Sequence, residues 1–228
     1  MKTLVLTVGA LVCATTLVLA HGDVAPQPVN TDALPDVGEE WLIENPYRAE
    51  TAGVEVWQAA VEIGASGYNQ NCARCHGLEV ISGGLAPDLR FIEAEEYGDE
   101  WYVERFVHGY TQNGITKMPA FGDLLGQKAA WAIRTYIETR PDDEMVNERS
   151  DELKAMRDQF AAWADDTAGA DPDAAKTRLS ELADEIETLS GAPVADSVAF
   201  RASKVIDGTP AAYKSAAEIL TIGLSAAN

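Results

Sequence analysis

Two cysteines and a histidine stand together in the run Cys72-Ala73-Arg74-Cys75-His76. Two thiols at this spacing can add to both vinyl groups of a haem, and the adjacent imidazole can then bind the iron from one face. Covalent attachment suits an exported protein, because the cofactor cannot be lost. The sequence therefore predicts one covalent haem c, attached through Cys72 and Cys75, with His76 as an axial ligand of the iron.

Three other uses of the cysteine pair fit the sequence less well. A zinc site would need a fourth ligand and usually a second ligand pair, and the chain has no other C-x-x-C. A thioredoxin-like pair lies at the start of a helix that follows a strand, whereas this pair follows a predicted helix. A plain disulfide would leave His76 without a role. Haem attachment uses all three residues.

The second axial ligand is predicted to be Met118, which lies 42 residues after His76 in a loop that contains glycine and proline. A thioether is a soft ligand, and His/Met ligation raises the reduction potential of a haem. Met118 could instead be ordinary packing, since methionine is adaptable. His108 is the competing ligand, but it ends a predicted helix, where the helix dipole favours a charged, solvated imidazole.

With both axial positions filled by protein, a substrate would find no open site on the iron. This arrangement favours electron transfer over oxygen or peroxide chemistry, and the chain is expected not to be an enzyme.

Helices and loops are predicted to alternate around the motif. The predicted helices cover 54–70, 99–108 and 125–140, and the loops between them cover 78–98 and 110–122. Asp99 is expected to cap the second helix. Pro141 is expected to end the third.

The N-terminal residues have the pattern of an export signal. Lys2 precedes an apolar stretch, Leu4 to Ala20, which is short for a membrane span. We expect residues 1–20 to be a signal peptide that is removed together with Cys13, which places the mature protein in the periplasm. Residues 21–50 contain four prolines and predict an irregular arm on the surface of the following domain.

The chain changes character after about residue 145. This region is rich in Ala, Asp and Glu and has neither Cys nor His. Apolar residues at steps of three and four predict four helices. The predicted segments are 147–166, 172–190, 194–207 and 210–225. We expect residues 145–228 to form a small antiparallel bundle.

The net charge of −20 and the pI near 4.3 exclude nucleic acid and anionic membrane surfaces as partners. The same charge is compatible with steering toward a positively charged patch on a partner protein. It is equally compatible with simple solubility, because net charge reports association and solubility rather than fold.

The order of these features resembles the class I cytochrome c family. The resemblance implies that the helix 54–70 crosses the helix 125–140, with Gly64 or Gly67 at the contact and Tyr68 and Tyr136 nearby. It also implies that the carbonyl of Pro87 accepts a hydrogen bond from His76. Arg90 is implied, more loosely, as a partner of a haem propionate.

A narrower likeness is to the small cytochrome c-550 type. The segments that carry it are 45–48, 68–78, 81–90, 113–114, 118–119 and 131–140. Members of that group accept electrons from quinoprotein (PQQ-dependent) alcohol dehydrogenases in the periplasm. The resemblance covers about residues 44–140 and does not extend to the C-terminal region.

These inferences predict an all-α protein: a class I cytochrome c domain at 51–141 around one covalent haem, followed by a helical bundle at 145–228. The predicted function is a periplasmic one-electron carrier between a PQQ-dependent alcohol dehydrogenase and the respiratory chain. One alternative is a haem sensor or peroxidase-like protein with a labile Met118. Another is a redox domain attached to a helical binding or oligomerisation module.

Overall fold

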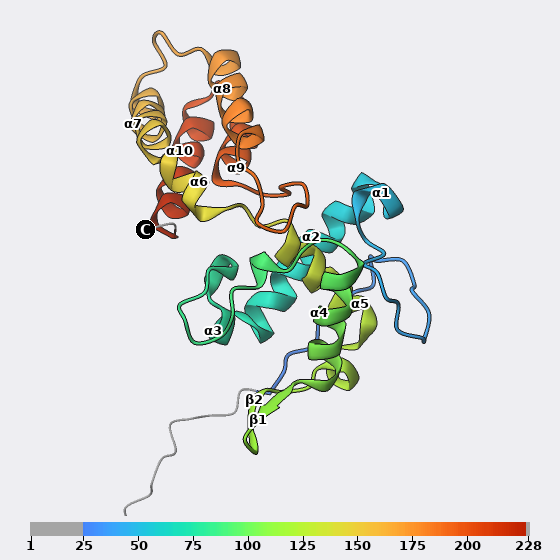
Figure 1. The fold of residues 1–228 in the computed structure, drawn as a ribbon. Helices are drawn as coiled ribbons and strands as arrows, with labels where there is room; N and C mark the ends of the chain where they lie inside the picture. Colours follow the sequence, from blue (N-terminus) through green and yellow to red (C-terminus); the bar gives the residue numbers. More distant parts are fainter. Residues whose placement is uncertain (1–24, 227–228) are drawn as a thin grey trace, which may run out of the picture.

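A computed structural model describes residues 25–226 of the chain, and the predicted signal peptide at 1–20, with Cys13, lies outside this range. The described residues form two groups of helices (Figure 1), each with its own hydrophobic core. The first core holds the helices around the cysteine motif, and the second holds the C-terminal helices. Within the described range, none of the helices combines the length and the apolar character needed to cross a bilayer.

The first group contains five helices, two short 3-10 turns and a hairpin. The helices are α1 (Ala49–Ala52), α2 (Val54–Asn71), α3 (Ala73–His76), α4 (Glu96–His108) and α5 (Gly122–Glu138). The turns are η1 (Leu78–Val80) and η2 (Leu89–Phe91), and the strands are β1 (Tyr110–Gln112) and β2 (Ile115–Met118). Residues 25–48, within the predicted arm, form neither helix nor strand.

The crossing of α2 and α5 is the closest helix contact in this group. A Cβ atom at Gly64 would overlap the carbonyl oxygen of Ala132, so the two backbones can approach this closely only with glycine at that position. The rings of Tyr68 and Tyr136 lie 5.4 Å apart beside the crossing. The predicted crossing, with Gly64 or Gly67 at the contact and both tyrosines nearby, is therefore confirmed, and Gly64 makes the closer approach.

The loop predicted at 110–122 instead contains the antiparallel hairpin β1–β2. Its turn is Asn113-Gly114, and both residues have positive φ angles, of 53° and 75°. This is the conformation that an Asn-Gly pair adopts between twisted strands. The all-α prediction holds with this one small addition.

Asp99 was predicted to cap the helix that follows it, and this prediction is wrong. The helix begins at Glu96, so Asp99 lies inside its first turn and is fully buried. Its carboxylate accepts hydrogen bonds from the backbone of Asn45 at 2.8 Å, from Arg48 at 2.8 Å and from Arg134 at 2.9 Å. A buried carboxylate needs such partners, so Asp99 acts as a buried counter-ion and does not cap the helix.

A buried ion network joins the N-terminal arm to α4 and α5. Arg48, at 2.8 Å from both Asp99 and Glu138, reaches in from the arm. Arg134, which like Glu138 lies on α5, pairs with Asp99 and is 3.7 Å from Glu138. Burial raises the pKa of Glu138 above its ordinary value, although the two arginines act in the opposite direction. The network adds to the hydrogen bonds with Gln127 that also tie the arm to α5.

The C-terminal group contains five helices. They are α6 (Asp143–Glu148), α7 (Ser150–Asp165), α8 (Pro172–Asp184), α9 (Val198–Val205) and α10 (Pro210–Ala226). Helix α10 packs against α7 and α9 (Figure 1), and an aromatic cluster of Phe160, Trp163 and Tyr213 lies between α7 and α10. The segment predicted to run from 172 to 190 ends six residues earlier, at Asp184. The residues after it form a connection that contacts the first group.

That connection, residues 185–197, joins the two groups through backbone hydrogen bonds. Ala94 donates to the carbonyl of Ser190 at 2.9 Å, and Asp142 donates to the carbonyl of Glu187 at 2.8 Å. The hydroxyl of Ser190 donates to the carbonyl of Glu138 at the end of α5. The C-terminal helices are therefore seated on the first group as well as linked to it in sequence.

Replacing Gly64 with Ala should destabilise the protein by about 1–3 kcal/mol, because the added methyl group forces α2 away from α5. Urea unfolding of the haem-loaded protein measures this loss. The matched control is Gly83→Ala at an exposed loop position, where an added Cβ meets nothing within 4 Å. The control should lie within about 0.5 kcal/mol of wild type. Equal stability of the two variants would refute the tight crossing.

Candidate haem site

The helical turn α3 places the two cysteines and the histidine of the motif side by side. Cys72 continues from α2 with its amide bonded to the carbonyl of Tyr68 at 2.7 Å. The amides of Cys75 and His76 both donate to the carbonyl of Cys72 at 3.0 Å. Residues three and four apart on a helical turn share one face. The two thiols and the imidazole are therefore presented together.

Neither cysteine is in a disulfide. Cys75 is exposed, whereas Cys72 is partly covered by the first core. Burial, reinforced by the neighbouring Cys75, raises the pKa of Cys72 to about 12. A dithiol redox pair needs one cysteine with a lowered pKa so that its thiolate can attack. Cys72 is therefore not activated as the attacking thiolate, whereas a thioether needs no thiolate once it has formed.

The ring of His76 is held by the backbone of a later loop. Its Nδ1 lies 2.9 Å from the carbonyl oxygen of Pro87, which is the contact that the family resemblance implies. A carbonyl can only accept, so Nδ1 carries the proton and donates it. This leaves the lone pair on Nε2 directed elsewhere, and a histidine that binds metal through one nitrogen commonly donates a hydrogen bond from the other.

The backbone immediately after His76 is tightly constrained. Gly77 has a φ of 87°, and a Cβ at this position would overlap the carbonyl oxygen of Ile81. The hydroxyl of Tyr68 donates to the carbonyl of Gly77 at 2.8 Å. Tyr68 was predicted near the helix crossing, and this bond was not predicted. Its position four residues before Cys72 was the available signal, since it puts the ring on the same side of α2 as the motif.

Arg90 lies in the loop that follows Pro87 and is buried. Its guanidinium contacts Asp88 at 2.6 Å and Asp143 at 2.5 Å. Burial acts against ionisation of Asp88, but the hydrogen bonds from Arg90 dominate and hold the pKa of that carboxyl below its ordinary value. The structure therefore gives Arg90 two carboxylate partners from the chain itself.

Met118 comes from a separate element, the last position of β2. It is half-buried and packs against the first core. Gly109 lets the chain turn closely at the base of the hairpin, since it has a φ of 69° and a Cβ there would lie 2.5 Å from the carbonyl oxygen of Met118. The competing histidine, His108, is exposed at the end of α4.

Large apolar side chains are exposed on the segments that carry these groups. Leu78 and Leu85, both in the segment between His76 and Pro87, are 73% and 77% exposed, and Ile115 on β2 is 59% exposed. A porphyrin is a flat apolar group that could cover such side chains. The chain thus offers two unpaired thiols, an imidazole with an available Nε2, a thioether and apolar area. This set of donors fits a covalently bound haem.

Comparisons with known proteins agree with this chemistry. Residues 59–137 match the family described as cytochrome c oxidase, cbb3-type, subunit III. Cytochrome c550 of Pseudomonas aeruginosa is 53% identical over 128 residues, which cover 56% of this chain and 86% of that protein. No solved structure gives a significant match.

Two weaker relatives are much larger proteins of Pseudomonas putida. The quinohemoprotein alcohol dehydrogenases ADH-IIG and ADH IIB are each 32% identical to this chain, over 85 and 98 residues. These matches cover 37% and 43% of this chain but only 11% and 13% of the dehydrogenases. The high identity to cytochrome c550 over most of that protein's length is decisive: the chain belongs to the cytochrome c family and is an electron carrier with covalently bound haem c.

Proposed function

We propose that this protein is a periplasmic carrier that accepts single electrons from a PQQ-dependent alcohol dehydrogenase and delivers them to the respiratory chain. The observation that carries the proposal furthest is the identity to cytochrome c550, combined with the geometry around His76. Delivery to a terminal oxidase is supported by the match to a cbb3-type oxidase subunit family.

The donors described above support the site assignment. Cys72 and Cys75 form the two thioether bonds, and Nε2 of His76 and the sulfur of Met118 are the axial ligands. When bound, the haem supplies an iron that alternates between the ferrous and ferric states. The carbonyl of Pro87 keeps the His76 ring in one orientation and in one tautomer. Arg90 remains the candidate partner for a propionate, which it would bind in addition to Asp88 and Asp143.

The choice of two protein ligands decides between a carrier and an enzyme. If His76 and Met118 occupy both faces of the iron, no position is left for dioxygen or peroxide, and the chain can only exchange electrons. The rival function, a gas sensor or peroxidase-like protein, requires Met118 to leave. The half-buried position of Met118 against the first core supports retention, since its side chain is held by packing.

The donor assignment has support of a different kind. The segments of two quinohemoprotein alcohol dehydrogenases that resemble this chain indicate that this type of haem domain works with alcohol oxidation in those proteins. A separate carrier of the same family would perform the corresponding transfer between molecules. Its strong negative charge would guide it to a positively charged surface on the donor.

Replacing Met118 with Ala should leave one coordination position of the iron free for an added ligand. Carbon monoxide added to the ferrous variant should shift its visible spectrum completely, whereas the ferrous wild-type protein should show no shift. The matched control is Met156→Ala, because Met156 packs against the second core, away from the haem motif. The control should behave like wild type. A full shift in the wild-type protein would instead support the sensor or peroxidase-like alternative.

Mixing the protein with a substrate-reduced PQQ-dependent alcohol dehydrogenase tests the donor. Stopped-flow absorbance should show haem reduction at least about tenfold faster than for an unrelated cytochrome c of similar net charge, because complementary surfaces raise the rate of encounter. The advantage should shrink as salt screens the charges. A rate no higher than that of the unrelated cytochrome would remove this donor while leaving the haem assignment intact.

A further inference from the structure

Two backbone segments lie next to His76: one follows it in the chain, and the other supplies the acceptor for its ring. The loop directly after it contains Glu79 and Val80, whose φ angles are 57° and 65°. Residues with a Cβ rarely adopt positive φ, and two in succession persist only when the surrounding structure fixes them. The second segment is the loop that brings the carbonyl of Pro87 to Nδ1 of His76.

A chain of ion pairs runs from the C-terminal region to the first segment. Arg140, which is buried over the ring of Tyr136, binds Glu79 at 2.5 Å. Asp196 binds the same guanidinium at 3.5 Å and is itself bound by Arg201 at 3.2 Å. Asp196 and Arg201 both follow residue 145, outside the part of the chain that resembles cytochrome c-550. Asp196 of the C-terminal region therefore binds Arg140, and Arg140 binds Glu79 in the loop with positive φ angles.

A second chain of ion pairs reaches the other segment. Asp143, the first residue of α6, binds Arg90 at 2.5 Å. Arg90 in turn binds Asp88, which directly follows Pro87, through contacts of 2.6 Å and 3.0 Å. Arg90 thus ties the residue beside the His76 acceptor to the start of the C-terminal helices.

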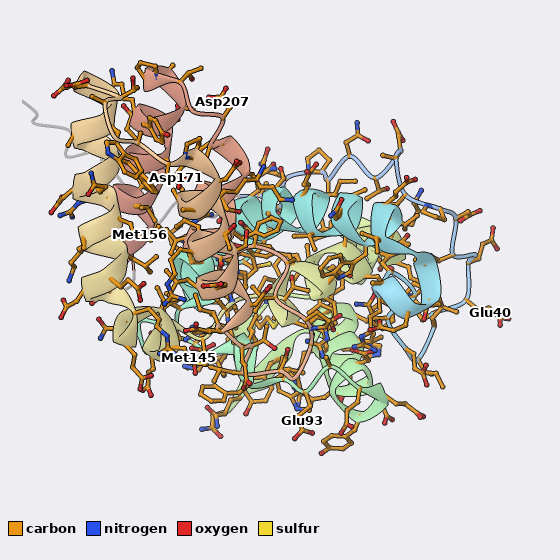
Figure 2. The ribbon with its side chains drawn as sticks, turned by 90° about the horizontal axis from the view of Figure 1, so that it is seen from above. Glu40, Glu93, Met145, Met156, Asp171 and Asp207 are labelled. Atoms are coloured by element: carbon orange, nitrogen blue, oxygen red, sulfur yellow. The ribbon has the colours of Figure 1, made fainter. Side chains whose placement is uncertain are left out.

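Apolar side chains from both groups of helices line a shared cavity beside these ion pairs. A cavity of about 260 Å³ lies between the two groups of helices, with Glu79, Ile81 and Arg140 on one side and Val198, Ile219 and Ile222 on the other. Figure 2 shows the C-terminal helices beside the end of α2 that carries the motif. The C-terminal region therefore meets the loop after His76, in addition to its contacts with Ala94 and Glu138.

We propose that the C-terminal group of helices, which begins with α6 at Asp143, positions the axial histidine. Asp196 acts through Arg140, and Asp143 acts through Arg90, on the two segments that orient His76. The proposal rests on the proposed function insofar as it takes His76 to be an iron ligand. A firmly held Nδ1–H···O bond makes the imidazole a stronger donor to iron, which stabilises the ferric state. The C-terminal helices would thus lower the reduction potential of the haem.

The double variant Asp143→Asn/Asp196→Asn tests the proposal in the full-length haem-loaded protein. Each arginine keeps its other carboxylate, Asp88 or Glu79, so neither is left as an unpaired buried charge. Two quantities are measured: the solvent exchange rate of the His76 Nδ1 proton by NMR in the ferrous protein, and the reduction potential.

The matched control is Asp142→Asn/Asp184→Asn. It removes the same charge, and Asp142 is adjacent to Asp143. Asp142 caps α6 by accepting from the amide of Glu144, a role that Asn also fills. Within residues 25–226, neither control residue pairs with Arg90 or Arg140. Asp184 is exposed at the end of α8.

The proposal predicts that the Nδ1 proton exchanges at least about tenfold faster in the test variant, since local opening becomes easier. It also predicts a potential more positive than that of the control. Exchange and potential equal to those of the control would overturn it. If the double variant loses helical content, Arg140→Lys replaces it as the test. This variant keeps the positive charge but replaces the planar guanidinium, which can bind two carboxylates, with a single ammonium group. Unchanged exchange in Arg140→Lys would then overturn the proposal.

The wild-type spectrum separates this proposal from the ligand assignment. Iron-bound His76 should show ring protons strongly shifted by the porphyrin in the ferrous protein. Their absence would refute His76 as a ligand, and with it the proposed function. Their presence together with control-like variants would refute only the positioning role.

Discussion

The hydrogen bond from Nδ1 of His76 to the carbonyl of Pro87 is the interaction on which the site depends, because it determines which nitrogen is free for iron and where it points. Everything around it keeps donor and acceptor in place. Tyr68 bonds to Gly77 just beyond the histidine, and Gly64 allows α2 to lie against α5, so the motif begins from a fixed helix end. A shift of this helix would move the cysteines and the histidine together.

The features that the sequence predicted correctly are those with local signals. The spacing of Cys72, Cys75 and His76 indicates its chemistry without reference to the rest of the chain, and the main helices follow from apolar periodicity and from Pro141. Gly64 was identified through family resemblance, and the structure gives the physical reason, since any side chain would strike the backbone of α5. The Asn113-Gly114 pair suits a hairpin turn, but its flanking residues are exposed and lack an alternating pattern, so the sequence did not predict the hairpin.

The features that the sequence could not predict depend on partners far away in the chain. Asp99 has the position of a capping residue, and only the approach of Arg48 and Arg134 shows that it is a buried counter-ion. The same holds for Glu79 and Arg140, which are 61 residues apart. No local pattern distinguishes such carboxylates from solvated ones, particularly in a chain with 37 acidic residues. The way the C-terminal helices are seated on the haem-binding half became visible only in three dimensions.

The central claim, that one covalently held haem is bound between His76 and Met118, is tested most directly by the electronic absorption spectrum of the oxidised protein. The account predicts a weak band near the red edge of the visible region, which reports sulfur bound to ferric iron, and predicts that this band disappears in Met118→Ala. An oxidised wild-type spectrum without the band, or a preparation that gives up its haem to acidified acetone, would contradict the account.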